Sequence, residues 1–419
     1  MRILWLKTEL LHPIDKGGKI RTYQMLKELK REHHITYLTL DDGTAAAEAR
    51  ELATEYCHDL ICVPHRTRPK FSPGFYAGLA FNLASRLPYF MRKYKSAAMR
   101  RQIAIQLERE TFDVVVCDFL MPSINMPARP GCATLLFQHN VEAMIWQRHF
   151  EIQNSRLKKA YLRVEARKTR AFERATTRKF DYVVAVSRED VETMRRDYGL
   201  EHVAEVPTGV DTAYFRPRTG EAPEPHTLVF TGSMDWLPNE DAIQYFVEQV
   251  LPRIRASVPD VSLVVVGRNP SSGLVELSRR QPSIVVTGRV DDVRRFMERA
   301  AVYIVPIRIG GGTRLKIFEA MAMERPVVST TVGAEGLPVQ DGVELLIADT
   351  PDSFADAVIR ALTDHEFARG LSDRAARSVR DNFGWHRVAA TFTDLCERAQ
   401  RSHLSNKNVE LEKEVPTIV

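Results

Sequence analysis

A triple-glycine loop followed by two basic residues is the segment of this sequence best suited to bind an anion. Residues 310–312 are Gly-Gly-Gly, and they lie between the apolar run at 302–305 and a helical pattern. Glycines let the backbone approach a ligand closely and adopt positive φ angles. The start of the helix offers unpaired N–H groups and the positive end of a dipole. We therefore predict an anion site made by Gly311, Gly312, Thr313, Arg314 and Lys316.

The same loop has a second interpretation, in which it only closes a strand–helix turn and Arg314 and Lys316 are solvated. The order of strand, glycine loop, basic pair and Glu319 favours the anion site. Glu319 is placed to accept hydrogen bonds from a sugar or ribose hydroxyl. The spacing differs from the G-x-G-x-x-G and Walker fingerprints. Thr313 also suits a helix cap, where it competes with an anion for the same N–H groups.

Further candidates in the first half lie where expected strands end. Gly17 and Gly18 follow the strand at residues 3–6 and open a helix over residues 21–30. His139 follows the strand at 134–137. Ligands of open α/β sheets bind at the carboxyl ends of the strands, which favours a ligand contact for His139 over a structural role. We expect Ser187, at another strand end, first of all to cap the next helix.

Short apolar runs that alternate with longer amphipathic segments position these residues. Continuous apolar strands separated by helices are typical of parallel sheets covered on both faces. The pattern predicts an α/β protein with two Rossmann-like, doubly wound parallel-sheet domains. The expected strands are residues 3–6, 35–40, 60–63, 114–117, 134–137, 182–186, 228–231, 263–266, 284–287, 303–305, 327–329 and 345–347.

A polar, Pro-rich segment at residues 216–226 marks the boundary between the two domains. Such a stretch belongs to neither sheet and indicates a hinge. We expect an N-terminal Rossmann-like domain at 1–208, a linker at 209–226, a C-terminal Rossmann-like domain at 227–385, a helix at 386–400 that packs back toward the N-terminal domain, and a disordered tail at 401–419.

Bulk composition excludes several classes of protein. A chain of 419 residues is too long to fold around one ordinary hydrophobic core, so we expect two domains. The net charge of +5 suits anionic small molecules or a membrane surface and is too small to indicate nucleic acid. Five cysteines, an odd number, indicate a reducing compartment. The spacing of Cys57, His58, Cys62 and His65 fits no usual zinc site, so we expect no metal.

Membrane contact has two interpretations. No stretch reaches the roughly 18–20 apolar residues needed to span a bilayer, and charge near the N-terminus argues against a secretory signal, so we expect a cytoplasmic protein. The aromatic and apolar segment at 71–94 and the basic segment at 156–179 suit peripheral docking on an anionic membrane at its inner face. A core helix and a solvated basic helix explain the two segments equally well.

The second half contains, in order, Phe230-Thr231-Gly232-Ser233-Met234, Val266-Gly267, Gly288-Arg289-Val290-Asp291-Asp292-Val293, the glycine loop, Glu319-Ala320-Met321-Ala322, Pro326-Val327-Val328 and Gly333-Ala334-Glu335-Gly336-Leu337. Together these segments resemble the donor domain of family 4 glycosyltransferases. That family has the GT-B architecture, in which two Rossmann-like domains face each other across a cleft. The resemblance covers nearly all of residues 225–385 and continues as weaker, ordered matches in the N-terminal half.

Two departures from the family pattern concern the donor site. The family usually carries two glutamates separated by seven residues; Glu319 matches the second, whereas Gly311 stands at the first. The sequence resembles a subgroup in which a Gly-Gly-Gly-Thr-Arg-x-Lys loop replaces the first glutamate. The Arg and Lys that often hold the diphosphate after the first donor-domain strand are absent from residues 233–239. Arg314 and Lys316 are the natural substitutes, because a leaving diphosphate needs cationic or N–H partners.

The resemblance also implies the roles of individual residues. Glu319 would hold the ribose and the backbone near Val290 the base. The histidine of the His139 segment contacts the donor sugar in related enzymes. The donor-binding set is completed by the glycines of two loops and one serine: Gly17, Gly18, Gly232 and Ser233.

The reaction implied by the resemblance is a retaining transfer of a hexose or related sugar. The donor would be a UDP- or GDP-linked sugar and the acceptor a hydroxyl of a glycan or lipid-linked molecule, in polysaccharide or lipid-linked glycan synthesis. No cofactor or metal is expected, because no Asp-x-Asp motif ends a strand. Basic side chains and the positive end of a helix dipole would stabilise the diphosphate in place of a metal ion. A nucleotide-sugar epimerase and a non-catalytic nucleotide-sugar-binding protein of the same fold remain alternatives. A phosphorylase-like enzyme would need a cofactor-bearing lysine segment, which we do not find.

Overall fold

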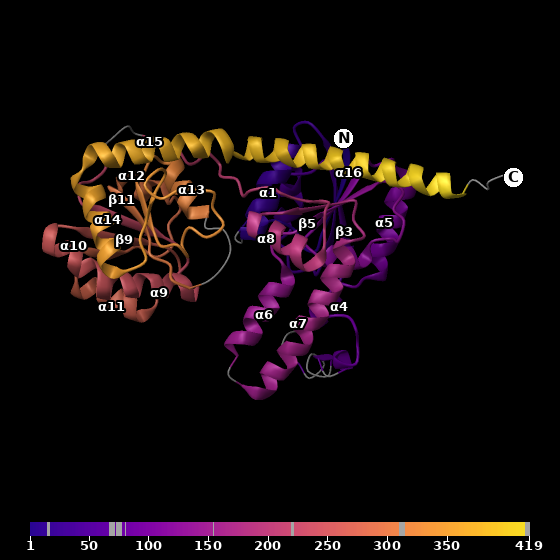
Figure 1. The fold of residues 1–419 in the computed structure, drawn as a ribbon, viewed down its shortest axis with the longest axis horizontal. Coiled ribbons are helices and arrows are strands. Elements are labelled where there is room, and N and C mark those ends of the chain that lie inside the picture. Colours follow the sequence, from indigo (N-terminus) through magenta and orange to yellow (C-terminus); the bar gives the residue numbers. More distant parts are fainter. Residues whose placement is uncertain are drawn as a thin grey trace. The chain divides into compact units, whose positions relative to one another are not determined.

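The computed structural model describes residues 1–14, 17–66, 72, 78–79, 81–153, 155–218, 222–309 and 315–414. The chain divides into two compact units (Figure 1). The N-terminal unit comprises Met1–Pro207 and the segment from Val388 onward, and the C-terminal unit comprises Thr208–Arg387. Each unit is built on one parallel sheet, which confirms the expected fold class of two doubly wound α/β domains.

The N-terminal unit has a seven-stranded parallel sheet in the order β3-β2-β1-β4-β5-β6-β7. The order reverses between β1 and β4, which is the position where doubly wound sheets bind ligands. The strands are β1 (Arg2–Lys7), β2 (His34–Asp41), β3 (Asp59–Pro64), β4 (Val114–Asp118), β5 (Ala133–Phe137), β6 (Tyr182–Ala185) and β7 (Val203–Glu205). The helices between them are α1 (Gly17–Leu29), α2 (Glu48–Glu51), α4 (Tyr89–Arg92), α5 (Ala97–Arg109), α6 (Glu142–Ile152), α7 (Arg156–Thr177) and α8 (Arg188–Thr193).

The C-terminal unit has a six-stranded parallel sheet in the order β10-β9-β8-β11-β12-β13, with the reversal between β8 and β11. Its strands are β8 (Thr227–Thr231), β9 (Ser262–Val266), β10 (Ile284–Val286), β11 (Val302–Val305), β12 (Val327–Ser329) and β13 (Leu346–Ile347). Its helices are α9 (Leu237–Tyr245), α10 (Leu251–Ser257), α11 (Ser272–Arg280), α12 (Arg294–Arg299), α13 (Leu315–Ala322), α14 (Pro351–Thr363) and α15 (His365–Asn382).

The central strands are buried along their whole length, as their apolar sequences require. Every residue of β4, β5, β8 and β11 is buried. Helices cover both faces of such a sheet, so no alternation of polar and apolar side chains is possible there. The charged residues that end β1 and β4, Lys7 and Asp118, are buried as well.

The last helix, α16 (Trp385–Glu414), returns the chain to the N-terminal unit. The Phe392 ring packs against Trp5 and Phe137, with ring centroids 5.5 and 5.1 Å away. His33 Nε2 lies 3.0 Å from Thr393 Oγ1. These contacts make α16 part of the core of the N-terminal unit.

The helix continues to Glu414, so the expectation of a helix ending at residue 400 and a disordered tail from 401 was wrong for residues 401–414. The physical reason is that residues 401–414 contain neither Pro nor Gly, and the first helix-breaking residue is Pro416. The last five residues, 415–419, lie outside the described chain.

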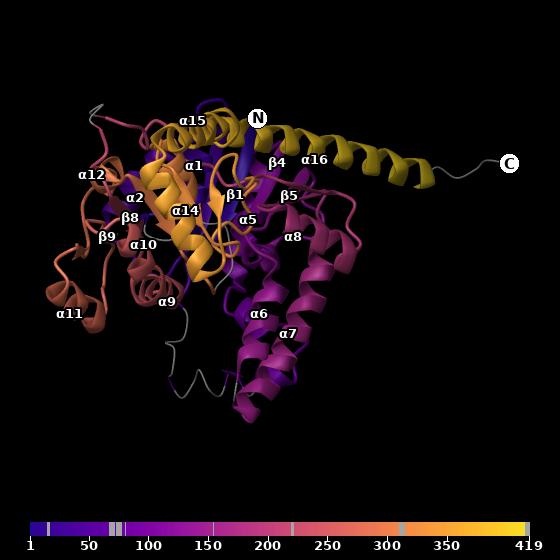
Figure 2. The same cartoon turned by 60° about the vertical axis from the view of Figure 1, so that its left-hand side comes forward.

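Helices α6 and α7 form a hairpin that extends away from the sheet of their own unit (Figures 1 and 2). The two helices pack along each other. Trp146 of α6 stacks on Phe90 of α4, with ring centroids 5.6 Å apart, and this contact ties the base of the hairpin to the unit. The hairpin leaves the sheet after β5, at its carboxyl edge.

Candidate functional site

A buried ion pair lies at the switch point of the N-terminal sheet. Lys7 is the last residue of β1 and Asp118 the last of β4, and these strands are neighbours. Lys7 Nζ donates to Asp118 Oδ2 at 2.8 Å. Trp5 Nε1 donates to the same oxygen at 3.0 Å. Both charged side chains are almost completely excluded from solvent, so each depends on the other to remain ionised in the interior.

Thr22 joins helix α1 to this pair. Its hydroxyl accepts from Lys7 Nζ at 2.7 Å and lies 2.6 Å from Asp118 Oδ2, to which it donates. The Gly18 carbonyl is 3.0 Å from the same hydroxyl. The first turns of α1 are thereby fixed beneath the carboxyl ends of β1 and β4.

His139 completes the cluster from the segment after β5. Its Nε2 lies 2.8 Å from Asp118 Oδ1, and Arg21 Nη1 lies 3.3 Å from its Nδ1. The imidazole stacks on Phe119, with ring centroids 3.9 Å apart, and only 4% of the residue is exposed. Because an arginine only donates, Nδ1 is the acceptor nitrogen of a neutral His139 ring in its contact with Arg21.

The charges of the cluster follow from burial and from the ion pair. Burial lowers the pKa of His139 to about 3, although Asp118 acts in the opposite direction. Burial alone would raise the pKa of Asp118, but Lys7 and His139 outweigh it and hold that pKa below its usual range. Burial lowers the pKa of Arg21 to about 10, which leaves it cationic at neutral pH. His139 is thus a neutral hydrogen-bonding group and not an acid or base near pH 7.

The two predicted glycines of this unit differ in what surrounds them. A Cβ atom on Gly18 would lie 2.9 Å from the Phe119 ring, so the close approach of that ring requires glycine. A Cβ atom on Gly17 would meet nothing within 4 Å. Phe119 itself has a φ of 72°, a left-handed conformation that is uncommon for an aromatic residue. The structure therefore brings Gly18 and His139 together through Phe119, and Gly17 stands at the solvent-exposed start of α1.

In the C-terminal unit, Lys316 of α13 reaches the carboxyl end of β8. Its Nζ donates to Asn239 Oδ1 at 3.0 Å and lies 4.1 Å from the centroid of the Phe230 ring. Asn239 Nδ2 in turn donates to the Ser233 carbonyl at 2.8 Å. A Cβ atom on Gly232 would lie 2.7 Å from both Lys316 Nζ and Asn239 Nδ2. Glycine at 232 is what lets this cation approach the loop after β8.

Glu319 lies one turn after Lys316 on α13 and is partly exposed. Burial raises its pKa to about 7, and Lys316 opposes that effect. Within the part of the chain that the structure describes, its carboxylate has no hydrogen-bond or ion-pair partner. A carboxyl group in this setting can accept hydrogen bonds from a ligand without first losing a partner.

Val290 lies in the loop between β10 and α12, where it is partly buried against the core of the unit. This loop is tied to its neighbours because Gly267 N donates to the Gly288 carbonyl at 3.2 Å. Gly232 N donates to the Val266 carbonyl at 2.9 Å. The loops after β8, β9 and β10 therefore form one continuous edge. The remaining predicted residues, Gly311, Gly312, Thr313 and Arg314, lie outside the described residues.

Several polar residues of these two clusters were missed by the sequence analysis. Asp118 and Lys7 each end an otherwise apolar strand, and that signal could have identified them. Arg268 follows β9, and its Nε donates to Ser233 Oγ at 2.8 Å. Arg268 therefore places a basic group beside the loop at residues 233–239, which contains no Arg or Lys of its own. Arg21 and Asn239 give no sequence signal, because only the folded chain brings them to His139 and Lys316.

Among the described residues, no group of three or more His, Cys, Asp and Glu side chains is arranged to hold a metal ion. Cys57, of the Cys/His-rich segment, is buried, and its Sγ lies 3.2 Å from the Ala53 carbonyl. Burial raises the pKa of its thiol to about 12. Both features suit a structural cysteine.

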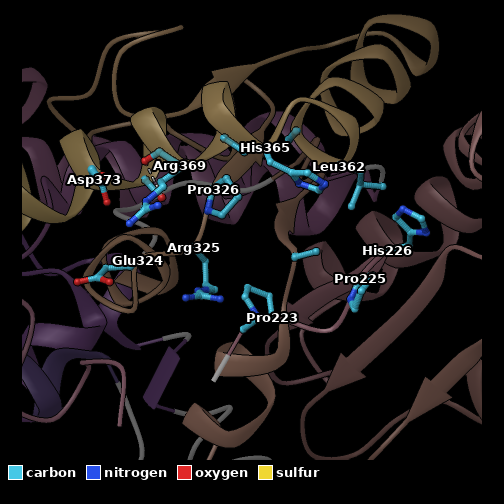
Figure 3. A pocket seen from close by; sticks show the side chains of 15 residues that line it. Pro223, Pro225, His226, Glu324, Arg325, Pro326, Leu362, His365, Arg369 and Asp373 are labelled. Atoms are coloured by element: carbon cyan, nitrogen blue, oxygen red, sulfur yellow. Dashed lines mark hydrogen bonds between the residues drawn. The ribbon is translucent and has the colours of Figure 1, made fainter. Parts of the chain in front are cut away.

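A cavity of about 690 Å³ lies elsewhere in the C-terminal unit (Figure 3). Its lining includes His226, Ala301 and Pro326, which directly precede β8, β11 and β12. Arg325, which also lines the cavity, donates to the carbonyls of Met323, Glu298 and Ala300. The cavity is therefore at the amino ends of the strands, opposite to the edge where Lys316 and Ser233 lie.

Family models match both halves of the chain. Residues 16–214 match the model described as Glycosyltransferase Family 4, and residues 225–364 match Glycosyl transferases group 1. The chain belongs to this glycosyltransferase family. Together the two matches span about four fifths of the sequence.

Two relatives show how far the sequence likeness of this glycosyltransferase extends. A 44.6 kDa protein in the cps region of Klebsiella pneumoniae is 22% identical over 405 residues, covering 93% of this chain and 98% of that protein. The phosphatidyl-myo-inositol mannosyltransferase of Mycolicibacterium smegmatis is 30% identical over 201 residues, which cover 46% of this chain and 51% of the mannosyltransferase.

Solved structures show the same fold across almost the whole glycosyltransferase chain. Sucrose-phosphate synthase from Thermosynechococcus elongatus matches with a TM-score of 0.64 at 18% identity, covering 95% of this chain and 98% of that one. WaaG, a glycosyltransferase involved in lipopolysaccharide biosynthesis, matches with a TM-score of 0.62 at 15% identity, and the match covers 94% of this chain and 99% of WaaG. Anabaena HepE, crystallised with UDP and glucose, matches with a TM-score of 0.62 at 12% identity, and the match covers 94% of this chain and 98% of HepE. None of the described helices is both long and apolar enough to cross a membrane.

Proposed function

We propose that this protein is a retaining glycosyltransferase that moves a sugar from a nucleoside diphosphate to a hydroxyl group of a glycan or lipid-linked acceptor. The observation that carries the proposal is the Lys316 ammonium held against Gly232 and Asn239, with the Glu319 carboxyl, which no described residue pairs, one turn further along α13. A cation and a carboxyl group at the carboxyl edge of a parallel sheet are suited to a diphosphate and a sugar hydroxyl, respectively.

The leaving diphosphate gains negative charge in the transition state, and a fixed cation stabilises it more than it stabilises the bound donor. Lys316 is held by Asn239 and by the Phe230 ring, so little reorganisation is needed when that charge appears. We assign Arg268 and Arg314 to the same diphosphate. No metal is required if these groups carry the charge, and the leaving phosphate itself would take the acceptor proton.

The N-terminal cluster would bind the sugar or the acceptor. His139 is neutral and fixed by Asp118, so it acts as a hydrogen-bonding group beside the reacting sugar and not as a proton donor. Arg21 adds a cation 3.3 Å from the imidazole. We assign the residues Gly17, Gly18, Gly232, Ser233 and Val290 to backbone contacts with the donor.

The comparisons support the donor and the class of product. HepE was crystallised with UDP-glucose, WaaG takes part in lipopolysaccharide biosynthesis, and one relative lies in a cps region. A UDP- or GDP-linked hexose and a polysaccharide or lipid-linked glycan fit these names. Nucleotide sugars are made in the cytoplasm, so we propose that the reaction takes place there, at the inner face of the cell membrane.

The test is incubation with a panel of UDP- and GDP-sugars, with nucleoside diphosphate release and the anomeric configuration followed by NMR. We expect slow hydrolysis of one donor with retention at the anomeric carbon, and loss of that activity in Lys316→Ala and Glu319→Ala. Interconversion at a sugar stereocentre without diphosphate release would indicate an epimerase. Tight binding with no turnover of any donor or acceptor would indicate a non-catalytic binding protein.

A further inference from the structure

Helix α7 carries a stripe of arginines along one face. Arg156, Arg163, Arg167, Arg170 and Arg174 are spaced by seven, four, three and four residues, and at 100° per residue they share one side of the helix. All five are exposed. The stripe runs over 18 residue steps from Arg156 to Arg174, which is about 27 Å at 1.5 Å per residue. One of the five, Arg170, lies 3.5 Å from the carboxylate of Asp197.

Both acidic residues of α7 are buried. Glu165 is fully buried and accepts hydrogen bonds from Tyr89 N at 2.7 Å and Lys168 Nζ at 3.1 Å. Glu173 is fully buried and accepts from Glu142 N and Ala143 N at 2.9 Å each. Neither carboxylate neutralises the stripe. The exposed charged side chains of α7 are therefore all basic.

Apolar side chains lie beside the stripe, at the free end of the hairpin and along its flank. Leu157 is 86% exposed and Val164, one heptad later on the same flank, is 37% exposed. Phe81 is 77% exposed and Leu83 48% exposed, and the residue between them accepts a hydrogen bond from Lys168 Nζ at 2.7 Å through its carbonyl. Leu157 and Val164 thus lie on the flank of the stripe, and Phe81 and Leu83 adjoin Asn82, which contacts Lys168 of the same helix.

We propose that this surface, the α6–α7 hairpin together with residues 81–83, docks on an anionic lipid bilayer. Arginines attract the acidic headgroups, and exposed Leu and Phe side chains enter the boundary between headgroups and acyl chains. The apolar flank favours a bilayer over a soluble polyanion, because a polyanion offers nothing for Leu157 and Phe81 to enter. The hairpin extends from the rest of its own unit in both views (Figures 1 and 2).

The position of the hairpin gives the docking a purpose. Helix α6 begins at Glu142, three residues after His139, so the hairpin leaves the sheet at the edge that carries the Asp118–His139 cluster. A lipid-linked acceptor in the docked bilayer would be presented near that edge. This purpose rests on the proposed glycosyltransfer, whereas the docking itself does not.

The experiment is cosedimentation of the full chain with vesicles of phosphatidylcholine alone or mixed with phosphatidylglycerol. We expect binding only to the mixed vesicles, weakened by added salt because exposed charges are screened. The double variant Arg163→Gln/Arg167→Gln should bind about 25-fold more weakly, from about fivefold for each arginine near an anionic surface. Leu157→Ser should weaken binding about tenfold.

The matched controls are exposed residues that do not belong to the hairpin. Arg279→Gln/Arg280→Gln removes two exposed charges from α11, and Leu404→Ser removes a Leu that is 61% exposed on α16. Both should bind vesicles as the parent protein does. Equal binding to both kinds of vesicle, or equal effects of hairpin and control variants, would overturn the proposal. A Leu157→Ser variant with unchanged binding, together with competition by a soluble polyanion, would point to an anionic polymer and overturn it too.

Donor hydrolysis without vesicles separates this proposal from the proposed function. The hairpin variants should release nucleoside diphosphate at the parent rate. Normal hydrolysis with no vesicle binding by the parent protein contradicts only the docking. Vesicle binding without hydrolysis of any donor contradicts only the proposed reaction.

Discussion

Replacing Asp118 with Asn tests the interpretation that one buried carboxylate organises the N-terminal cluster. The change keeps the shape of the side chain and removes the negative charge that Lys7 Nζ contacts at 2.8 Å. Breaking a buried ion pair by removing one partner costs about 3–5 kcal/mol. In a unit of this size, one kcal/mol corresponds to roughly 2–4 °C in Tm. We therefore expect a decrease of about 10 °C in the melting of the N-terminal unit.

The pH dependence of the variant gives a second, independent signature. The folded-state pKa of Lys7 is already lowered by burial, and Asp118 opposes that effect. Without Asp118 the folded state holds the Lys7 proton more weakly than the unfolded state does. Stability rises with pH wherever the unfolded state binds more protons, so Asp118→Asn should regain part of its lost stability as the pH rises toward the unfolded lysine value of about 10.4.

The assay is thermal unfolding of the parent, Asp118→Asn, Lys7→Met and the double variant, with hydrogen exchange of the β1 and β4 amides to localise the effect. The double variant should be more stable than either single variant, because replacing both members of a buried pair by groups without charge is often nearly neutral. Additive losses in the double variant, or single losses below about 1 kcal/mol, would refute the reasoning, since distant independent sites add and coupled ones do not.

Three further predictions concern the donor side and the glycine contacts. Gly232→Ala should raise the donor KM at least tenfold in steady-state kinetics, because its Cβ would lie 2.7 Å from Lys316 Nζ; an unchanged KM would contradict the contact. With a Glu319 pKa of about 7, the donor KM should fall as the pH rises from 6 to 8, and Glu319→Gln should abolish that dependence; a Gln variant that keeps it would exclude Glu319 as its source. Gly18→Ala should displace the Phe119 ring and lower kcat, measured with saturating donor; parent-like kcat would show that the ring can move freely.

The fold was predictable because each buried strand appears in the sequence as a short continuous run of apolar residues. The run at 114–117 is Val-Val-Val-Cys and becomes β4, and the run at 228–231 lies within β8. Strands buried on both faces need continuous apolar sequence, and few other structures do. The end of α16 was not predictable from hydrophobic periodicity, because residues 401–414 are mostly polar and extend a helix that has already been nucleated.

The candidate site was predictable only in part. Lys316 and Glu319 stand in a recognisable segment, whereas Asn239 and Arg268 become neighbours of the β8 loop only when β8, β9 and α13 are packed together. Asp118 ends an apolar strand, which is a usable signal, but its partners Lys7 and His139 are brought to it only by the pairing of β1, β4 and β5. The orientation of Glu165 and Glu173 likewise required the structure, since a count of charges along α7 does not show which face each occupies.

The central claim is that the Lys316 and Glu319 edge binds a nucleoside diphosphate sugar and transfers the sugar with retention. The most direct measurement is NMR of the parent protein and Lys316→Ala with the panel of UDP- and GDP-sugars and an added hydroxyl acceptor. We predict that the parent protein forms a new glycosidic bond with the anomeric configuration of one donor, and that Lys316→Ala does so at least a hundredfold more slowly, in line with the roughly 10²–10³-fold cost of losing one transition-state charge contact. A product of inverted configuration, or a Lys316→Ala variant as active as the parent protein, would contradict the account.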